Sequence, residues 1–168
     1  MRIETERLII TDFTPDMAQA VHLNSLDEDN RRFVPDEVFE TVEEARETIE
    51  FLMGQYGGEE GPFVHPVLLK TGENIGYVQL VNIGEDWELG YHIAEAYRGK
   101  GYATEAAKAM IDFAKNNFGI TRFRASHVEP NRASGRVMEK CGFVPTGETV
   151  VDPSQGRDTP IRVLRLEI

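Results

Sequence analysis

Residues 97–105 read Tyr-Arg-Gly-Lys-Gly-Tyr-Ala-Thr-Glu and place two basic side chains and two glycines just before a predicted helix. At a helix start several backbone N–H groups lack an intrahelical partner, and the helix dipole adds partial positive charge. Gly99 and Gly101 allow the backbone to come close to a ligand, and Arg98 and Lys100 add charge. The stretch therefore predicts a cradle for a phosphate group.

Two common phosphate loops do not fit this stretch. A P-loop requires a glycine, four further residues and then Gly-Lys-Ser/Thr, but Lys100 is followed by Gly101. The dinucleotide-binding fingerprint requires a third glycine where Thr104 stands. The pattern that remains is Arg98-x-x-Gly101-x-Ala103. It resembles R/Q-x-x-G-x-G/A, the pyrophosphate loop of the GNAT superfamily of acyl-CoA-binding N-acetyltransferases.

Two further stretches carry the same resemblance. Residues 131–143 contain Asn-x-x-Ser and then Glu-Lys-Cys-Gly-Phe, which is similar to the N-x-x-S and E-K-x-G-F signature of the superfamily. Residues 5–8, Thr-Glu-Arg-Leu, resemble the first strand of the RimJ/RimL-like subgroup, the ribosomal-protein N-terminal acetyltransferases. The three stretches occur in the order of that subgroup, so the resemblance covers nearly the whole chain.

The resemblance implies direct transfer of an acetyl group from acetyl-CoA to a primary amine, with no metal. It implies that the pyrophosphate of acetyl-CoA lies on the turn, that Ile93 pairs with the pantetheine arm as an added strand would, and that Asn131 bonds the pantetheine amides. Asn131 is also the expected N-cap of its helix. The residues predicted to bind the cofactor are Ile93, Arg98, Gly99, Lys100, Gly101, Ala103, Thr104 and Asn131.

A protonated amine must lose a proton before it attacks, so a carboxylate should lie near the acceptor. Glu88 is our candidate base, because the family often has an acid at this point of the strand before the turn. A surface glutamate paired across the sheet explains Glu88 equally well, and Glu85 or Asp86 could serve in its place. Glu88 could also bind a cationic substrate without removing a proton.

Two other side chains complete the predicted chemistry. By its position relative to Arg98, Tyr91 is expected to offer its backbone N–H to the thioester carbonyl. Many superfamily members have a tyrosine proton donor in the helix before G-F, but Met138 occupies that place here. Ser134 matches the serine of the ribosomal subgroup and is our candidate proton donor, with a capping contact to Asn131 as the alternative.

No metal or thiol chemistry is expected. The four histidines, His22, His65, His92 and His127, do not have the spacing of metal ligands and are expected to pack or to lie on the surface. Cys141 is the single cysteine, so no disulfide can form within the chain. We expect Cys141 to be a small buried residue rather than a nucleophile, because no paired base accompanies it.

The formal net charge of −11 argues against a nucleic-acid partner and favours cationic ones, such as a peptide N-terminus, a polyamine or an aminoglycoside. No apolar run approaches the length of about 20 residues that spans a bilayer, so no membrane partner is expected. Residues 1–4 lead directly into strand-like sequence without the apolar stretch of a secretory signal, which predicts a cytoplasmic enzyme. A homodimer is left open.

Hydrophobic periodicity predicts about seven strands and about four helices, which form one domain over residues 1–168. We expect an α/β, GNAT-like fold with a mixed, mostly antiparallel twisted sheet and helices on both faces. The acidic run 27–29 is expected to be a solvated surface. The resemblance implies that the segment between the first two helices walls the acceptor pocket, so residues 30–36 could meet the substrate. The strands are predicted at 6–13, 63–69, 74–83, 86–94, 122–128, 143–151 and 161–168, the helices at 15–26, 41–55, 103–118 and 131–141, and a polar loop at 152–160. Thr14 and Thr41 are the expected N-caps of the first two helices, and Gly119 is the expected C-cap of the third.

Two other functions stay open at this point. A non-catalytic acyl-CoA-binding sensor would keep the cradle and is compatible with Met138. A nucleotide-binding module would bind ATP or NAD in competition with CoA. The acceptor is not determined by the sequence, because one fold serves many substrates.

Overall fold

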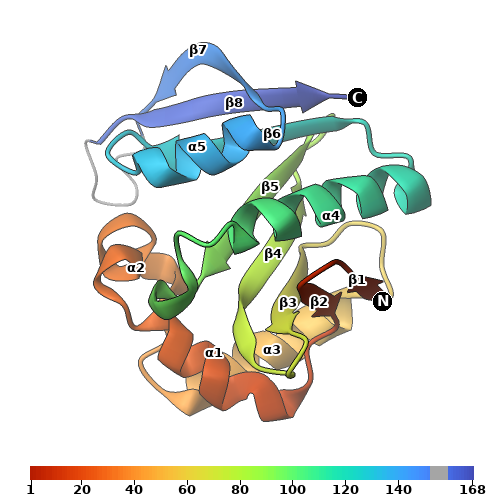
Figure 1. The fold of residues 1–168 in the computed structure, drawn as a ribbon, viewed down its shortest axis with the longest axis vertical. Coiled ribbons are helices and arrows are strands. Elements are labelled where there is room, and N and C mark those ends of the chain that lie inside the picture. The colour runs from red at the N-terminus through yellow and green to blue at the C-terminus, as the bar shows by residue number, and fades with distance from the viewer. Residues whose placement is uncertain (152–158) are drawn as a thin grey trace.

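The computed structural model describes residues 1–151 and 159–168, so most of the predicted polar loop lies outside the described residues. Within them, one mixed sheet is covered by helices on both faces (Figure 1). Its strands are β1 Arg2–Glu4, β2 Leu8–Thr11, β3 Phe63–Leu69, β4 Asn74–Asn82, β5 Trp87–Ile93, β6 Arg122–Val128, β7 Val144–Val150 and β8 Ile161–Glu167. The α-helices are α1 Ala18–Ser25, α2 Glu28–Phe33, α3 Val42–Gln55, α4 Tyr102–Phe118 and α5 Arg132–Lys140.

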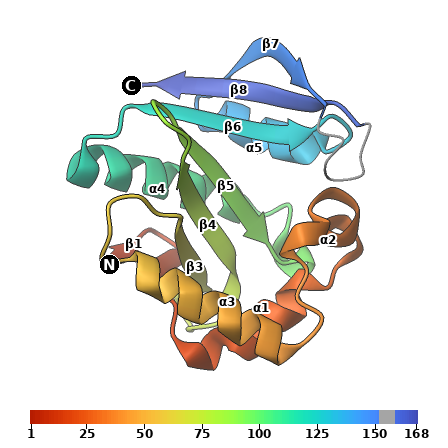
Figure 2. The same cartoon turned by 180° about the vertical axis from the view of Figure 1, so that it is seen from behind.

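The strands follow the order β1-β2-β3-β4-β5-β6-β8-β7, and every pair is antiparallel except β5 and β6. The parallel pair is short, because only Trp87 and Glu88 of β5 are paired with Phe123 and Arg124 of β6. Beyond these residues the two strands diverge (Figure 2). The second half of β5 therefore has a neighbour on its β4 side only.

Two hydrophobic clusters hold the helices to the two faces. The larger cluster packs α4 and α5 on one face, with Phe123, Met110 and Met138 almost fully buried. The smaller cluster packs α1 and α3 on the other face, around Phe13 and Ile49. The alternating sides of a strand decide which cluster a residue joins. The predicted architecture, with helices on both faces of a mostly antiparallel sheet, is confirmed.

The counts were too low, because the described residues form eight strands and five α-helices. The strand predicted at 6–13 is β2, and a tight turn pairs it with the additional strand β1. The additional helix is α2, whose six residues are too few to show helical periodicity. The helix predicted from residue 15 begins as a 3-10 turn, Pro15–Met17, and the predicted N-cap Thr14 makes no capping bond to the backbone, because its hydroxyl bonds the Asp16 carboxylate instead.

The predicted helix caps are otherwise confirmed. The Thr41 side chain accepts a hydrogen bond from the Glu44 N–H at the start of α3. The Asn131 side chain accepts one from the Ser134 N–H at the start of α5, and Gly119 ends α4 with a φ of 67°. Of the helices that the structure describes, none combines the length and apolar character that a membrane span requires.

Candidate active site

The predicted phosphate turn joins β5 to α4 and has the backbone shape that its glycines suggest. A short 3-10 turn, η3 Glu95–Tyr97, leads into it, and α4 begins at Tyr102. Gly99 and Gly101 have φ angles of 75° and 82°, a region that side chains other than glycine rarely adopt. Gly101 is the N-cap of α4 and has no side chain that could cap the helix. The first N–H groups of α4 are therefore left to an external acceptor.

Arg7 supports this turn from the N-terminal strands. Its Nη1 donates to the Lys100 carbonyl over 2.8 Å, and its Nε donates to Glu105 Oε1 over 2.7 Å. The Arg7 guanidinium also lies 4.4 Å from the centroid of the Tyr102 ring. Thr5 Oγ1 donates to Glu105 Oε2 over 2.6 Å. The Thr-Glu-Arg-Leu stretch thus holds the turn and the first helical turn of α4, a role that sequence analysis did not assign to it.

The charge of Glu105 follows from these contacts. Partial burial alone would raise its pKa, but the hydrogen bonds from Thr5 and Arg7 outweigh this effect, and the net pKa of Glu105 is lowered. An ionised carboxylate in the first turn of a helix is also favoured by the helix dipole.

Arg98 was expected to add charge to the phosphate turn, but its guanidinium has protein partners. Its Nε donates to the Ile93 carbonyl over 2.8 Å, and its Nη2 and Nη1 donate to Asp27 over 2.8 Å and Asp29 over 3.0 Å. The Asp27 side chain is only 8% exposed. The expectation that residues 27–29 form a solvated surface is therefore wrong for Asp27, which serves as the N-cap of α2. Lys100 stays exposed near the Tyr97 ring.

The backbone of β5 offers free edge groups beside this turn. The Ala94 N–H donates to the Ile75 carbonyl over 2.8 Å. Because bonded and non-bonded pairs alternate in an antiparallel ladder, the N–H groups of Ile93 and Tyr91 point away from β4. On that side β6 has already diverged. These are the two residues that sequence analysis expected to meet the cofactor through the backbone.

The side chain of Tyr91 meets Ser134, a contact that sequence analysis missed. The Tyr91 hydroxyl lies 2.9 Å from Ser134 Oγ and 2.9 Å from the Ser134 carbonyl oxygen. Burial raises the pKa of Tyr91 to about 12, so the phenol stays protonated. Asn131 lies next to this pair, because its side chain accepts from the Ser134 N–H over 3.3 Å. Met138 is 2% exposed in the core and cannot replace the hydroxyl chemistry.

Glu88 lies on the opposite face of β5. It is paired with Val81 of β4 and Arg124 of β6, and the alternation of a strand places its side chain on the side away from Tyr91. Burial raises the pKa of Glu88, and the nearby Arg124 partly counteracts this. Glu88, the carboxylate of β5, therefore binds a proton more tightly than an exposed glutamate does. The alternative acid Asp86 pairs with Arg122 over 3.0 Å.

The other alternative acid and the single cysteine are less suited to catalysis. The Glu85 side chain is 86% exposed. Burial raises the pKa of the Cys141 thiol to about 11, so little thiolate forms near neutral pH, as expected for a residue without a nucleophilic role.

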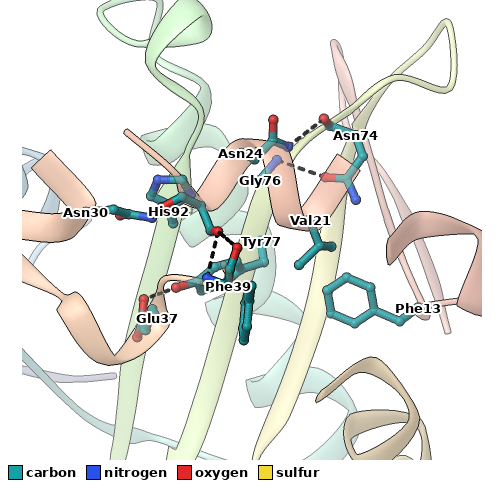
Figure 3. Close-up of a pocket in the computed structure, with 11 residues that line it drawn as sticks. Phe13, Val21, Asn24, Asn30, Glu37, Phe39, Asn74, Gly76, Tyr77 and His92 are labelled. Carbon is teal, nitrogen blue, oxygen red and sulfur yellow. Dashed lines mark hydrogen bonds between the residues drawn. The ribbon is translucent and has the colours of Figure 1, made fainter. Parts of the chain in front are cut away.

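A small cavity lies on the Glu88 face, between β4, β5 and the segment around α2 (Figure 3). The Tyr77 hydroxyl donates to the Glu37 carboxylate within it. Burial raises the pKa of Glu37. The cavity volume of about 20 Å³ is enough for a water molecule and too small for an amine substrate.

The histidines hydrogen-bond within the protein. His22 Nδ1 lies 2.7 Å from the Phe39 carbonyl oxygen, and His65 Nδ1 lies 3.0 Å from that of Thr11. His92 contacts Asp27. In the described part of the chain, no group of three or more histidine, cysteine or acidic residues is arranged to hold a metal ion.

Comparison with known proteins identifies the family. The model of the acetyltransferase (GNAT) domain matches residues 7–144. The chain belongs to the GNAT acetyltransferase family. YnaD of Bacillus subtilis, named as an uncharacterized N-acetyltransferase, is 32% identical to this GNAT chain over 146 residues, which cover 85% of this chain and 82% of YnaD.

Solved GNAT structures have the same fold. An acetyltransferase of the GNAT family from Bacillus anthracis is 28% identical, with a TM-score of 0.87, and the match covers 99% of this chain and 98% of that chain. RimL, the ribosomal L7/L12 α-N-protein acetyltransferase in complex with coenzyme A, is 18% identical with a TM-score of 0.82 over 100% of this chain and 98% of that one. At this identity the likeness to RimL concerns the fold alone.

Proposed function

We propose that this GNAT acetyltransferase takes its acetyl group from acetyl-CoA and transfers it directly to a primary amine. The observation that carries the proposal is the unpaired edge of β5 beside the uncapped start of α4. An extended pantetheine arm needs backbone donors and acceptors along one side, and a pyrophosphate needs free N–H groups at a helix start. Both features lie within the residues 91–104.

The donor-binding role is divided among backbone and side chains. Ile93 and Tyr91 offer edge N–H groups, and Gly99, Gly101 and the residues after them leave N–H groups free for phosphate oxygens. Lys100 adds an exposed positive charge. Ala103 and Thr104 lie in the first turn of α4, and Asn131 lies beside Ser134, where an amide of the pantetheine arm would be within reach of α5. Bound acetyl-CoA supplies the activated acyl group.

The acid and base roles fall on the two faces of β5. We assign the base to Glu88, because burial raises its pKa and so increases its affinity for the proton that the amine must lose. The acceptor then approaches from the face that carries α1 and α3. We assign the proton donor to Ser134, whose hydroxyl is held by the Tyr91 hydroxyl on the other face. The raised pKa of Tyr91 means that Tyr91 orients or relays a proton and does not remain ionised.

The acceptor in this proposal is a cationic amine. The net charge of −11 attracts cations and disfavours nucleic acid. RimL is named for the α-amine of a ribosomal protein, which makes a protein N-terminus the first acceptor to examine; polyamines and aminoglycosides suit the charge as well.

The test is release of free CoA from acetyl-CoA by the purified protein, with N-terminal peptides, polyamines and aminoglycosides as separate acceptors. We expect one class to release CoA and to appear as the acetylated product by mass spectrometry. The variants Glu88→Gln and Ser134→Ala should lose turnover while keeping acetyl-CoA binding. Binding of acetyl-CoA without turnover for any class would favour the sensor function, and lack of binding would contradict the donor site itself.

A further inference from the structure

The segment between α1 and α3 contacts the phosphate turn through Arg98. In both views α2 lies against the chain that leads into α4 (Figures 1 and 2). This segment comprises Asp27, α2 and the short turn η2 Pro35–Glu37. It belongs to the face that carries Glu88, from which the acceptor approaches in the function proposed above.

Asp27 uses its two carboxylate oxygens for two different tasks. Oδ1 accepts from the Asn30 N–H over 2.7 Å and so caps α2, while Oδ2 accepts from Arg98 Nη2 over 2.8 Å. His92 Nε2 lies 3.3 Å from the same Oδ2 and 3.2 Å from Arg98 Nη2. The second pair of Arg98, to Asp29, lies further out, since the Asp29 side chain is 61% exposed.

All three nitrogens of the Arg98 guanidinium bond protein groups, although the side chain is 32% exposed. Its Nε bonds the Ile93 carbonyl at the end of β5, and its two Nη groups bond the start of α2. The planar fork of an arginine fixes the relative positions of the groups it bonds better than a lysine could. The main chain of Arg98 enters the phosphate turn directly before Gly99. One residue thus joins β5, the phosphate turn and α2.

The segment has a second anchor at its other end. At that end the Glu37 carboxylate accepts from the Tyr77 hydroxyl of β4. Within α2, Asn30 is 3% exposed and donates from Nδ2 to the Ser25 carbonyl over 3.1 Å. Between these anchors Arg31, Arg32, Pro35 and Asp36 are exposed. Contacts of Asn30 and Arg31 also hold the segment, and its Asp27 end is bonded to Arg98 of the phosphate turn.

We propose that Asp27 is a positioning residue that couples the two substrate sites: through Arg98, donor binding at the phosphate turn orders the acceptor-side segment 27–37. The proposal rests on the proposed donor site. A ligand that fixes the turn also fixes the backbone of Arg98, and the Asp27 pair transmits this order to α2. By linkage, an acceptor that orders the segment must strengthen donor binding by the same factor.

Hydrogen–deuterium exchange of the full chain, with and without acetyl-CoA, tests the coupling without knowledge of the acceptor. In the natural protein we expect acetyl-CoA to slow exchange on the order of tenfold both in residues 97–104 and in residues 28–37, as typical coupling between sites predicts. In Asp27→Asn the slowing at 97–104 should remain and the slowing at 28–37 should be lost. Asparagine is as good an N-cap as aspartate, so α2 keeps its cap while the charge toward Arg98 is removed.

Two further variants make the result specific. Glu40→Gln breaks the exposed pair, 2.6 Å long, between Arg31 of α2 and Glu40, which lies just beyond the segment, and it should leave the slowing at 28–37 unchanged. Arg98→Lys keeps the positive charge but loses the planar guanidinium, and it should reduce the slowing at 28–37. If Asp27→Asn does not fold, Arg98→Lys tests the coupling in its place.

The outcomes separate this inference from the proposed function. Slowing at 97–104 without slowing at 28–37 in the natural protein would overturn the coupling and leave the donor site intact. Slowing at 28–37 that persists in Asp27→Asn would also overturn it. Absence of slowing at 97–104 would contradict the donor site, and with it the basis of the coupling.

Discussion

Replacing Arg7 by alanine should weaken acetyl-CoA binding, although Arg7 precedes Lys100 by 93 residues and is not itself a predicted ligand. The Arg7 side chain is 40% exposed, and that of Glu105 is 19% exposed. Hydrogen bonds that involve a charged group contribute about 1.5–3 kcal/mol when sheltered, and exposure to solvent reduces this value. We therefore expect Arg7→Ala to remove about 1–2 kcal/mol. This is similar to the entropic cost of ordering the backbone of roughly one residue.

This loss falls on the phosphate turn, because Arg7 bonds the Lys100 carbonyl between the two glycines. Without that bond the turn is less ordered before binding, so part of the binding free energy is spent on ordering it. We expect acetyl-CoA affinity to fall about 5–30-fold, which corresponds to about 1–2 kcal/mol. Titration calorimetry with acetyl-CoA measures the change, and thermal unfolding of the free protein reports the accompanying loss of stability.

Arg2→Ala is the matched control. Arg2 pairs with Glu4 on the neighbouring strand β1, and both side chains are more than half exposed, 60% and 55%. Arg2→Ala should leave acetyl-CoA affinity unchanged. Arg7→Lys should fall between the two, because a lysine cannot bond Glu105 and the Lys100 carbonyl with one planar fork. If Arg7→Ala changes the affinity no more than Arg2→Ala does, the reasoning that Arg7 holds the turn is refuted.

Three further predictions concern the chemistry and the stability. Ser134→Ala should lower kcat by about 100-fold, which is the lower end of the range that a general acid contributes. Tyr91→Phe should also lower kcat. If steady-state assays find kcat unchanged in both variants, the proton-donor assignment is wrong. Glu88→Gln should lower kcat and remove, from the pH profile of the residual kcat, the fall that occurs as pH decreases through the raised pKa of Glu88. A residual profile with the same fall as in the natural protein would speak against a base at this position. Burial also raises the pKa of Glu37, so the stability that its neutral form provides is lost as pH rises through that pKa. Glu37→Gln can still accept from Tyr77 and should raise Tm by about 2–4 °C at pH 8 and not at pH 4. An equal shift of Tm at both pH values would contradict the burial effect.

The local elements could be predicted because their signals lie within a few residues. The strands at 63–69 and 122–128 have the predicted bounds, since their alternating or apolar sequence and flanking turns are complete in the chain itself. The caps at Thr41 and Asn131 were predicted for the same reason. Helix α2 was missed, because its six residues are stabilised from outside, by the pair of Asp27 with Arg98, and not by a periodic apolar face.

The sequence by itself determined the phosphate turn and the strand and helix that flank it, because glycine at positive φ and hydrophobic periodicity act over short distances. The resemblance of three short motifs pointed to the family. Only the tertiary structure decided what the chemical groups touch. The pair of Arg98 with Asp27 joins residues 71 apart, and the contact of Tyr91 with Ser134 joins residues 43 apart. Whether a guanidinium meets a phosphate or a carboxylate, and how far burial moves the pKa of Glu88, depends on which distant elements pack beside it.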